Sequence, residues 1–367
     1  MKQIQKSIVS AGLAAALAVS AAVPAFAFYR TPANKKGILS SHVDLISDMQ
    51  NLGCSQVIFN YPVSLLNDSW QRQGMDAYIR SLDNAGLTTT MIVLNDWKDG
   101  DPMMPTQAPT GAAYYAFNAA TQEGQNRIRS TAQQLVSLYG NQVSNWIIGN
   151  EINNGITWNQ TGTYDLGAYC QNYAASFRIF YDTIKAANPE ARIFIPFDFR
   201  WNCPTIAGWF NVNQVLPQLN AQLRDLDYGI AWHAYPENFS NPDFMNASPN
   251  ATDSPDSAII NLKNLHVLTD YMQQADMLSP AGTVRHLILS EQGFTSSMGE
   301  DLQAACIAQA YSMANQNPFV EAFYLNRLVD APGEVAQGYS FGLWNCNGQG
   351  EIPTTRKAAW DAYRNAQ

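Results

Sequence analysis

Hydrophobic and polar positions follow two different periods in turn along the chain from about residue 41 onward. Apolar residues three or four positions apart indicate amphipathic helices, and they occur in eight ranges: 42–52, 70–85, 121–139, 165–187, 208–225, 256–278, 300–316 and 354–365. Short β-rich runs between these helices predict strands at 56–60, 88–95, 143–151, 192–199, 228–235, 286–291 and 320–326. Strands that alternate with helices favour parallel pairing through right-handed crossovers.

This alternation predicts a single-domain α/β protein with the (β/α)8 TIM-barrel fold, spanning residues 28–367. Seven strands are clear, whereas the first strand is poorly defined and has to lie within residues 28–40, where only residues 37–39 are eligible. An open doubly wound sheet is the alternative. Such a sheet usually has a glycine-rich turn after its first strand, but the sequence contains neither a GxGxxG nor a GxxxxGK motif.

The predicted loops differ in length at the two ends of the strands. Connections that enter strands are short, whereas four connections that leave strands are long: 96–120, 152–164, 236–255 and 330–352. In a (β/α)8 barrel the loops after the strands gather on one face, and this face carries the active site. The sequence therefore predicts one working face, formed by the C-terminal ends of the strands.

Residues 1–27 have the pattern of a secretory signal peptide. Lys2 and Lys6 precede an apolar segment, and residues 25–27 form a small-x-small cleavage site. The apolar segment is too short to span a bilayer, and no later stretch reaches about 20 uninterrupted apolar residues. We therefore expect a secreted, extracellular protein with no membrane attachment after cleavage. An uncleaved signal that serves as an anchor is the alternative.

Charge narrows the classes of partner. The formal net charge is -9, and removal of residues 1–27 makes it more negative, because that segment holds two lysines and no acid. An acidic chain with few basic clusters is poorly suited to nucleic acid or anionic lipid, so we expect no nucleic-acid partner. We also expect a monomer.

The cysteines are Cys54, Cys170, Cys203, Cys306 and Cys346. They show no CxxC spacing and no nearby histidine in a metal-ligand pattern, so we expect no metal site, and we expect no cofactor. An odd number leaves at least one thiol unpaired even after export. Cys54 and Cys306 lie in apolar settings that predict buried free thiols. If a disulfide forms, we favour Cys170 with Cys203.

Polar side chains stand at the ends of nearly all predicted strands. The fourth strand runs through an apolar stretch to Asn150 and Glu151, and the seventh ends in the same way at Glu291. In a barrel, these strands lie across the pore from each other, so their carboxylates can converge on one ligand. Paired carboxylates suit glycoside hydrolysis, which needs a proton for the leaving oxygen and negative charge opposite an oxocarbenium-like centre. The alternative is a pair of salt-bridged carboxylates that stabilise the rim.

These motifs resemble the clan A glycoside hydrolases, which are (β/α)8 barrels that act with retention. The resemblance rests on Asn150–Glu151, on Glu291 and on His233 and Tyr235 of the sixth strand. It implies that Glu151 is the acid/base and Glu291 the nucleophile. It also implies that Asn150 contacts the sugar 2-hydroxyl and that Tyr235 holds the nucleophile in place.

The tail, residues 323–360, is similar to that of a group of uncharacterised bacterial domains in this clan. Two features differ from many clan A families. No early strand ends in an arginine, for which Arg200 and Arg327 are the candidate substitutes, and the eighth strand carries Tyr324 in place of a tryptophan. Either the sugar platform is built differently, or Trp344 folds back over the site.

Polar and aromatic residues at the strand exits and in the following loops are candidate substrate contacts: Asn60, Asn95, Trp97, Asn150, Trp158, Trp201, His233, Tyr235, Asn326 and Trp344. Aromatic rings can stack on sugars, with loop packing as the alternative, and a core position is the alternative for His233. The sequence predicts a secreted retaining β-glycosidase that acts on a polysaccharide or oligosaccharide. A catalytically inactive carbohydrate-binding or cell-surface protein on the same barrel is the competing hypothesis.

Overall fold

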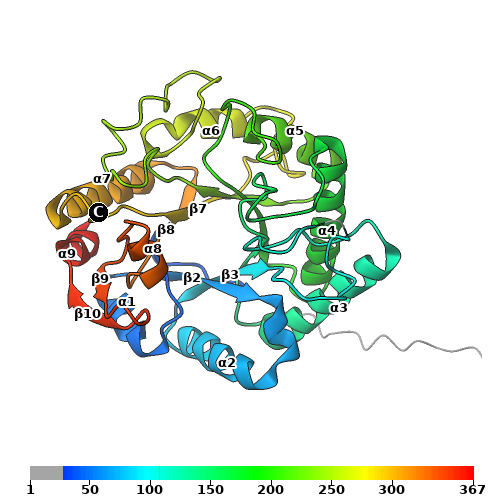
Figure 1. Ribbon diagram of the computed structural model, residues 1–367, viewed down its shortest axis with the longest axis horizontal. Helices are drawn as coiled ribbons and strands as arrows, with labels where there is room; N and C mark the ends of the chain where they lie inside the picture. Colours follow the sequence, from blue (N-terminus) through cyan, green and yellow to red (C-terminus); the bar gives the residue numbers. More distant parts are fainter. Residues whose placement is uncertain (1–27, 107) are drawn as a thin grey trace, which may run out of the picture.

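A computed structural model describes residues 28–106 and 108–367 of the chain. Eight parallel strands close into a barrel in chain order (Figure 1). They are β1 (Lys36–Leu39), β2 (Gln56–Pro62), β3 (Thr88–Leu94), β4 (Asn145–Ile148), β5 (Arg192–Phe197), β6 (Gly229–His233), β7 (Leu287–Gln292) and β8 (Val320–Leu325). The predicted single-domain barrel is confirmed, while the predicted signal peptide, residues 1–27, lies outside the described residues.

Helices surround the barrel and connect its strands (Figure 1). They are α1 (Ile46–Asn51), α2 (Ser69–Asn84), α3 (Gln122–Tyr139), α4 (Leu166–Ala187), α5 (Val212–Leu223), α6 (His266–Met272), α7 (Glu300–Gln316) and α9 (Ala358–Asn365). Asp68, Thr121 and Asp165 cap the first turns of α2, α3 and α4 with their side chains, each cap contributing about 1 kcal/mol. Within the described ranges, no helix is long and apolar enough to cross a membrane.

The first strand, β1, is the element that the sequence defines least. It forms where it was expected and pairs with β2 on one side and with β8 on the other. Its sequence signal is weak because it has only four residues, one of them a glycine. Packing requires this glycine, since a Cβ atom at Gly37 would lie 2.5 Å from Cδ1 of Tyr324.

Two apolar layers hold the barrel together. The inner layer consists of inward-facing strand residues: Ile58, Ile92, Leu94, Ile147, Phe194, Ala231, Ile288, Ala322 and Tyr324. The outer layer lies between the strands and the helices. Because side chains alternate along a strand, a residue two positions past an inner residue reaches the mouth of the barrel. His233 follows Ala231 in this way, and Asn326 follows Tyr324.

The chain after β8 contains elements that the sequence pattern did not predict. They are α8 (Pro332–Ala336) and an antiparallel hairpin of β9 (Trp344–Cys346) and β10 (Pro353–Arg356). Figure 1 shows the hairpin at the edge of the barrel, beside α1 and α9. Each element is only three to five residues long, too short to display a helical or strand period.

All five cysteines are free, so the favoured pairing of Cys170 with Cys203 is wrong. Cys170 is fully buried in α4, whereas Cys203 lies in the loop after β5, where its thiol donates to the carbonyl oxygen of Ala258 (3.1 Å). Cys54 and Cys306 are buried free thiols, as expected.

Candidate active site

The first carboxylate, Glu151, lies in a tight turn directly after β4. The strand ends at Ile148, three residues earlier than expected. Gly149 and Glu151 adopt φ values of 86° and 37°, a region that glycine enters freely and other residues rarely adopt. Asn150 lies half-buried between them. Backbone strain at a residue with a side chain is typical of functional sites.

The second carboxylate, Glu291, is aimed into the barrel mouth by an irregular register between β6 and β7. Ala231 pairs with Ile288, and both belong to the inner layer. Two residues later on β6, His233 pairs with Glu291 instead of Ser290. Simple alternation along β7 would point Ser290 inward and Glu291 toward the helices. The extra residue reverses this order, in the way that bulges re-aim side chains beside active sites.

His233 joins the two carboxylates. Its Nδ1 atom lies 3.0 Å from Oε1 of Glu151 and 3.8 Å from Oε2 of Glu291. These two oxygens are therefore no further apart than the sum of the two distances. The His233 side chain is 1% exposed, whereas those of Glu151 and Glu291 are 14% and 22% exposed. The imidazole is thus sealed behind two carboxylates that remain accessible.

Glu151 and His233 both bind protons more tightly than exposed side chains would. Burial raises the pKa of Glu151 to about 7, and the charges of Asp198 and Glu291 add to this effect, while His233 opposes it. Burial lowers the pKa of His233, but the charges of Glu291 and Glu151 outweigh burial, so the pKa is raised. Both shifts favour a proton within this pair near neutral pH.

Tyr235 holds Glu291 from another side. Its hydroxyl donates a hydrogen bond to Oε1 of Glu291 (2.6 Å) and accepts one from Nδ2 of Asn326 (2.6 Å). The position expected for Tyr235 thus agrees with this contact. Asn326 was expected to contact substrate, but it is only 3% exposed and lies behind the tyrosine. Its position makes it a support for Tyr235 instead.

A third carboxylate, Asp198 at the end of β5, organises the turn that carries Glu151. It accepts hydrogen bonds from Nδ2 of Asn153 (2.5 Å), from the indole N–H of Trp209 (2.6 Å) and from the backbone N–H of Arg200 (2.8 Å). Burial raises the pKa of Asp198, and these hydrogen bonds oppose the shift. Asp198 therefore fixes the backbone around the turn that follows β4.

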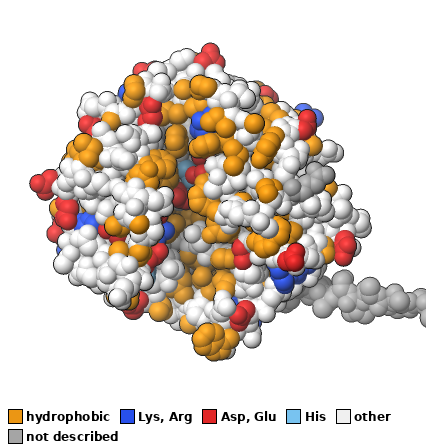
Figure 2. Space-filling model, viewed as in Figure 1, with side chains coloured by type: hydrophobic (Ala, Val, Ile, Leu, Met, Phe, Trp, Pro, Cys, Tyr) orange, Lys and Arg blue, Asp and Glu red, His pale blue; other side chains and the backbone are white. Residues whose placement is uncertain are grey.

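A hollow opens at the centre of the face formed by the strand exits. Figure 2 shows acidic and histidine side chains in this hollow and hydrophobic side chains along its walls. Such a mixture of apolar walls and a few convergent polar groups is typical of a small-molecule or sugar site. Within the described part of the chain, no group of three or more His, Cys, Asp or Glu residues is arranged to hold a metal ion.

Tyr114 is a residue of this face that the sequence did not single out as a substrate contact. Its side chain packs against the inner layer of the barrel, and its ring lies 6.0 Å from that of Trp158. Burial raises the pKa of Tyr114, and the charges of Asp96 and Glu291 add to this effect. The aromatic pair of Tyr114 and Trp158 therefore lies against the inner layer of the barrel.

Asn60 and Trp97 also have accessible side chains. Asn60 is exposed, two positions past the inner residue Ile58 on β2. Trp97 is 40% exposed and packs on Tyr115, with ring centroids 5.0 Å apart. Both positions are compatible with the expected contacts to substrate.

Asn95 and Trp201 were expected to contact substrate, but both side chains instead hold loops. Asn95 is 1% exposed, and its Nδ2 donates to the carbonyl oxygen of Ala116 (2.9 Å). Trp201 is 2% exposed, and its indole N–H donates to the carbonyl oxygen of Pro255 (2.8 Å). Irregular backbone after a strand needs such partners for its buried carbonyl groups.

Trp344 does not fold back over the site. Its indole N–H donates to Oδ2 of Asp48 in α1 (2.8 Å), and the guanidinium of Arg356 lies 5.0 Å from its ring. The indole therefore belongs to the contact between the tail hairpin and α1. The expectation that Trp344 lines the site is wrong.

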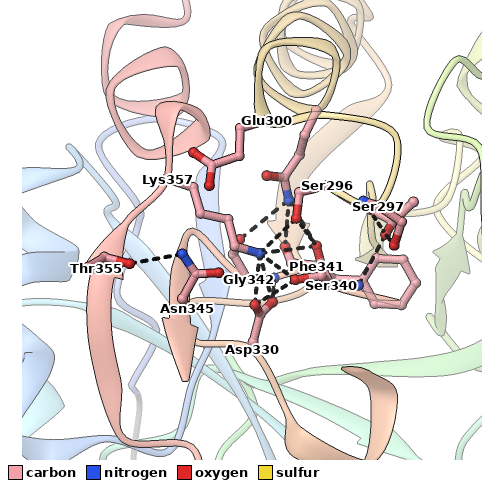
Figure 3. A network of polar contacts seen from close by, with 12 residues as sticks. Ser296, Ser297, Glu300, Asp330, Ser340, Phe341, Gly342, Asn345, Thr355 and Lys357 are labelled. Atoms are coloured by element: carbon pink, nitrogen blue, oxygen red, sulfur yellow. Dashed lines mark hydrogen bonds and ion pairs between the residues drawn. The ribbon is translucent and has the colours of Figure 1, made fainter. Parts of the chain in front are cut away.

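A buried ion pair fixes the segment after β8 (Figure 3). Nζ of Lys357 lies 2.8 Å from Oδ2 of Asp330, and the two side chains are 0% and 2% exposed. Lys357 also donates to Oγ of Ser340 (2.8 Å) and Ser296 (3.1 Å). The segment held in this way carries Phe341, whose ring lies 6.0 Å from that of Tyr235. The ion pair therefore supports the residue that holds Glu291.

The fold and the site together define a (β/α)8 barrel with paired carboxylates at the exits of its fourth and seventh strands. The sequence profile of DUF5722, a family of unknown function, matches residues 28–367, and the chain belongs to this family. A search of curated proteins finds no match.

Solved glycosidases have similar folds. β-Glycosidase BGL167 matches with a TM-score of 0.62 at 11% identity, over 88% of this chain and 85% of that chain. A glucosidase from Croceicoccus marinus matches with a TM-score of 0.59 at 14% identity, over 94% and 68% of the two chains. The family 1 β-glucosidase from Thermotoga maritima matches with a TM-score of 0.55 at 12% identity, over 89% and 87%. At the level of the fold, the expected resemblance to clan A glycoside hydrolases is confirmed.

Proposed function

We propose that this protein is a secreted retaining β-glycosidase that cleaves a polysaccharide or oligosaccharide. The observation that carries the proposal is the pair of carboxylates, Glu151 and Glu291, both within 3.8 Å of one imidazole nitrogen. The similarity of the fold to β-glucosidases supports it. The proposed chemistry uses these two side chains and a water molecule.

The distance limit between the two carboxylates favours retention. Carboxyl groups about 5 to 5.5 Å apart allow one of them to attack the anomeric carbon, whereas about 6.5 to 9.5 Å leaves room for an attacking water. The two contacts to His233, at 3.0 and 3.8 Å, exclude all but the lower end of the larger range for the two oxygens concerned. Direct attack by Glu291 therefore fits this spacing better than attack by water.

The proposed reaction has two displacements. In the first, Glu291 attacks the anomeric carbon while the bond to the leaving oxygen breaks and Glu151 gives its proton to that oxygen. In the second, Glu151 takes a proton from a water whose oxygen attacks the same carbon and releases Glu291. The raised pKa of Glu151, about 7, suits a group that donates a proton first and accepts one later.

The rate is expected to fall as pH rises through about 7, because Glu151 must be protonated for the first displacement. Replacement of Glu151 by alanine should remove this alkaline limb from kcat/KM for aryl glycosides. In this variant, kcat/KM for a glycoside whose leaving group needs no proton should stay close to the wild-type value. For a glycoside with a poor leaving group, kcat/KM should fall by about 10²- to 10⁴-fold. Equal losses for both leaving groups would argue against Glu151 as the proton donor.

Hydrolysis is tested with the purified mature protein and a panel of polysaccharides and aryl β-glycosides. We expect new reducing ends from at least one polymer or its oligosaccharides. Glycan binding without new reducing ends, even after long incubation, would instead support the carbohydrate-binding alternative.

We further propose that the protein is exported and cleaved after Ala27. The family match begins at Phe28, whose backbone is already fixed: its N–H donates to Oδ1 of Asn188 (3.1 Å), and Nδ2 of Asn188 donates to its carbonyl oxygen (2.8 Å). N-terminal sequencing of protein from the culture medium should begin at Phe28. An intact N-terminus beginning at Met1 would contradict cleavage.

A further inference from the structure

A chain of polar contacts continues from Tyr235 away from the cleft. Asn326, which donates to Tyr235 through Nδ2, accepts a hydrogen bond through Oδ1 from Nε of Arg327 (3.3 Å). Nη1 of Arg327 donates to Oε1 of Glu351 (2.5 Å), and Oε2 of Glu351 lies 3.4 Å from Nε2 of His42. The chain thus leads to the connection between β9 and β10 and to the loop after β1.

Glu351 is the nearer of two ionic partners of Arg327. The Arg327 side chain is 15% exposed, and its Nη2 also lies 3.5 Å from Glu334. Burial raises the pKa of Glu334 to about 7 against the charge of Arg327. Burial also acts to raise the pKa of Glu351, but the nearby imidazole of His42 and the guanidinium of Arg327 outweigh burial and lower this pKa. Glu351 therefore remains ionised when Glu334 begins to take up a proton.

The direction of the hydrogen bonds in this series of contacts decides whether Tyr235 donates its proton to Glu291. An asparagine amide can present either its oxygen or its NH₂ group to a neighbour. Because Nε of Arg327 is only a donor, it selects Oδ1 of Asn326 and leaves Nδ2 facing Tyr235. Tyr235 then accepts from the amide, so that its own proton is free for Glu291. The reversed amide would draw the Tyr235 proton away from the carboxylate.

We propose that Arg327 and Glu351 are positioning residues for the nucleophile: they orient the Asn326 amide so that Tyr235 donates its proton to Glu291. This inference rests on the proposed function, and it connects one residue of the β9–β10 hairpin, Glu351, to the support of the nucleophile. Arg327 thereby supports the nucleophile from the end of β8. No early strand of this protein ends in an arginine that could take this role.

Four variants test the chain by kcat and KM on the best aryl glycoside. Tyr235→Phe and Arg327→Met are each expected to lower kcat by about 10²-fold with little change in KM, as for a misplaced catalytic group. Asn326→Asp keeps the side-chain shape but removes the donor to Tyr235, so it should match Tyr235→Phe. Glu351→Ala should lower kcat by about 10-fold, because Arg327 itself remains.

A double-mutant cycle separates positioning from a general structural role. In the Tyr235→Phe background, Arg327→Met should lower kcat by less than about 3-fold further, since both act through the same hydroxyl. Gln349→Ala, exposed in the same β9–β10 connection, is the matched control and should retain wild-type kcat. The inference would be overturned if the fall in kcat of the double variant equalled the product of the two single falls. Wild-type kcat in Glu351→Ala would also overturn it.

The same four proteins of the cycle are also compared by their free energies of unfolding, a measurement that does not depend on enzymatic activity. The inference predicts that the destabilising effects of Tyr235→Phe and Arg327→Met do not add in the double variant, whereas the effects of independent sites would add. If the wild-type protein hydrolyses no glycoside, the proposed function fails, and the presence or absence of this coupling still decides whether the two residues act as one unit. Additive unfolding effects would overturn the inference in an active or an inactive protein.

Discussion

Replacement of Glu291 by alanine is expected to lower the rate of hydrolysis by on the order of 10⁴-fold or more, because the first displacement loses its nucleophile. Azide should restore part of the turnover, since it can attack the anomeric carbon from the space that the side chain vacates. Attack by azide is a single displacement, so a β-glycoside should give the α-glycosyl azide. The product is identified by NMR.

Glu151→Ala is the matched comparison for the azide experiment. There the glycosyl-enzyme still forms on Glu291, and azide replaces water in the second displacement, so the same substrate should give the β-glycosyl azide. The two variants thus predict azides of opposite configuration. Full activity of Glu291→Ala, or the same azide from both variants, would contradict the assignment of the two carboxylates.

Replacement of Lys357 by methionine is expected to lower the free energy of unfolding by about 3 to 5 kcal/mol, the usual effect of leaving one member of a buried ion pair without its partner. Lys357 and Asp330 are 0% and 2% exposed, so water cannot replace the ammonium group. Burial acts to lower the pKa of Lys357, and Asp330 opposes that effect. Chemical denaturation measures the change.

Asp330→Asn in the Lys357→Met background should recover much of this loss. The amide removes the uncompensated charge, and its oxygen can still accept the hydrogen bond that Asp330 receives from the backbone N–H of Gly342 (2.6 Å). Arg178→Met breaks an exposed ion pair with Asp225 and should change the free energy by less than about 1 kcal/mol. Similar effects for Lys357→Met and Arg178→Met would contradict a stabilising role for the buried pair.

Most of the fold could be predicted because the alternation of strand and helix patterns is repeated along the whole sequence. Each helix and strand of the barrel imposes its own period on the sequence, and a regular alternation leaves few topologies. The sequence was least informative where an element is short, as in β1, or where side-chain bonds replace periodicity. The helix expected at 256–278 is only His266–Met272, because residues before it form loops such as the turn in which Asn261 and Asn264 cap each other.

The main residues of the candidate site were also found in the sequence, for a reason of topology. Glu151, His233, Tyr235 and Glu291 lie at or just beyond the ends of parallel strands, and such ends meet on one face of a barrel. The directions in which these side chains point could not be predicted. The irregular register that turns Glu291 inward leaves no recognisable pattern in the sequence.

Loop residues were placed less well, since tertiary packing decides which way their side chains point. Trp201 and Trp344 are residues of the type that stacks on sugars. Their indole N–H groups, however, donate hydrogen bonds to acceptors outside the site. Tyr114 reaches the mouth of the barrel only because its loop folds back toward the inner layer. The contact between Arg327 and Glu351 joins residues whose proximity depends on an unpredicted hairpin.

The central claim is that Glu151 and Glu291 cleave a β-glycosidic bond by two displacements. It is tested most directly by following the anomeric configuration of the first-formed sugar by ¹H NMR, before mutarotation, during hydrolysis of the best β-glycoside. Two displacements at one carbon predict that the β-anomer appears first and the α-anomer only later. An α-anomer as the first product would contradict this account.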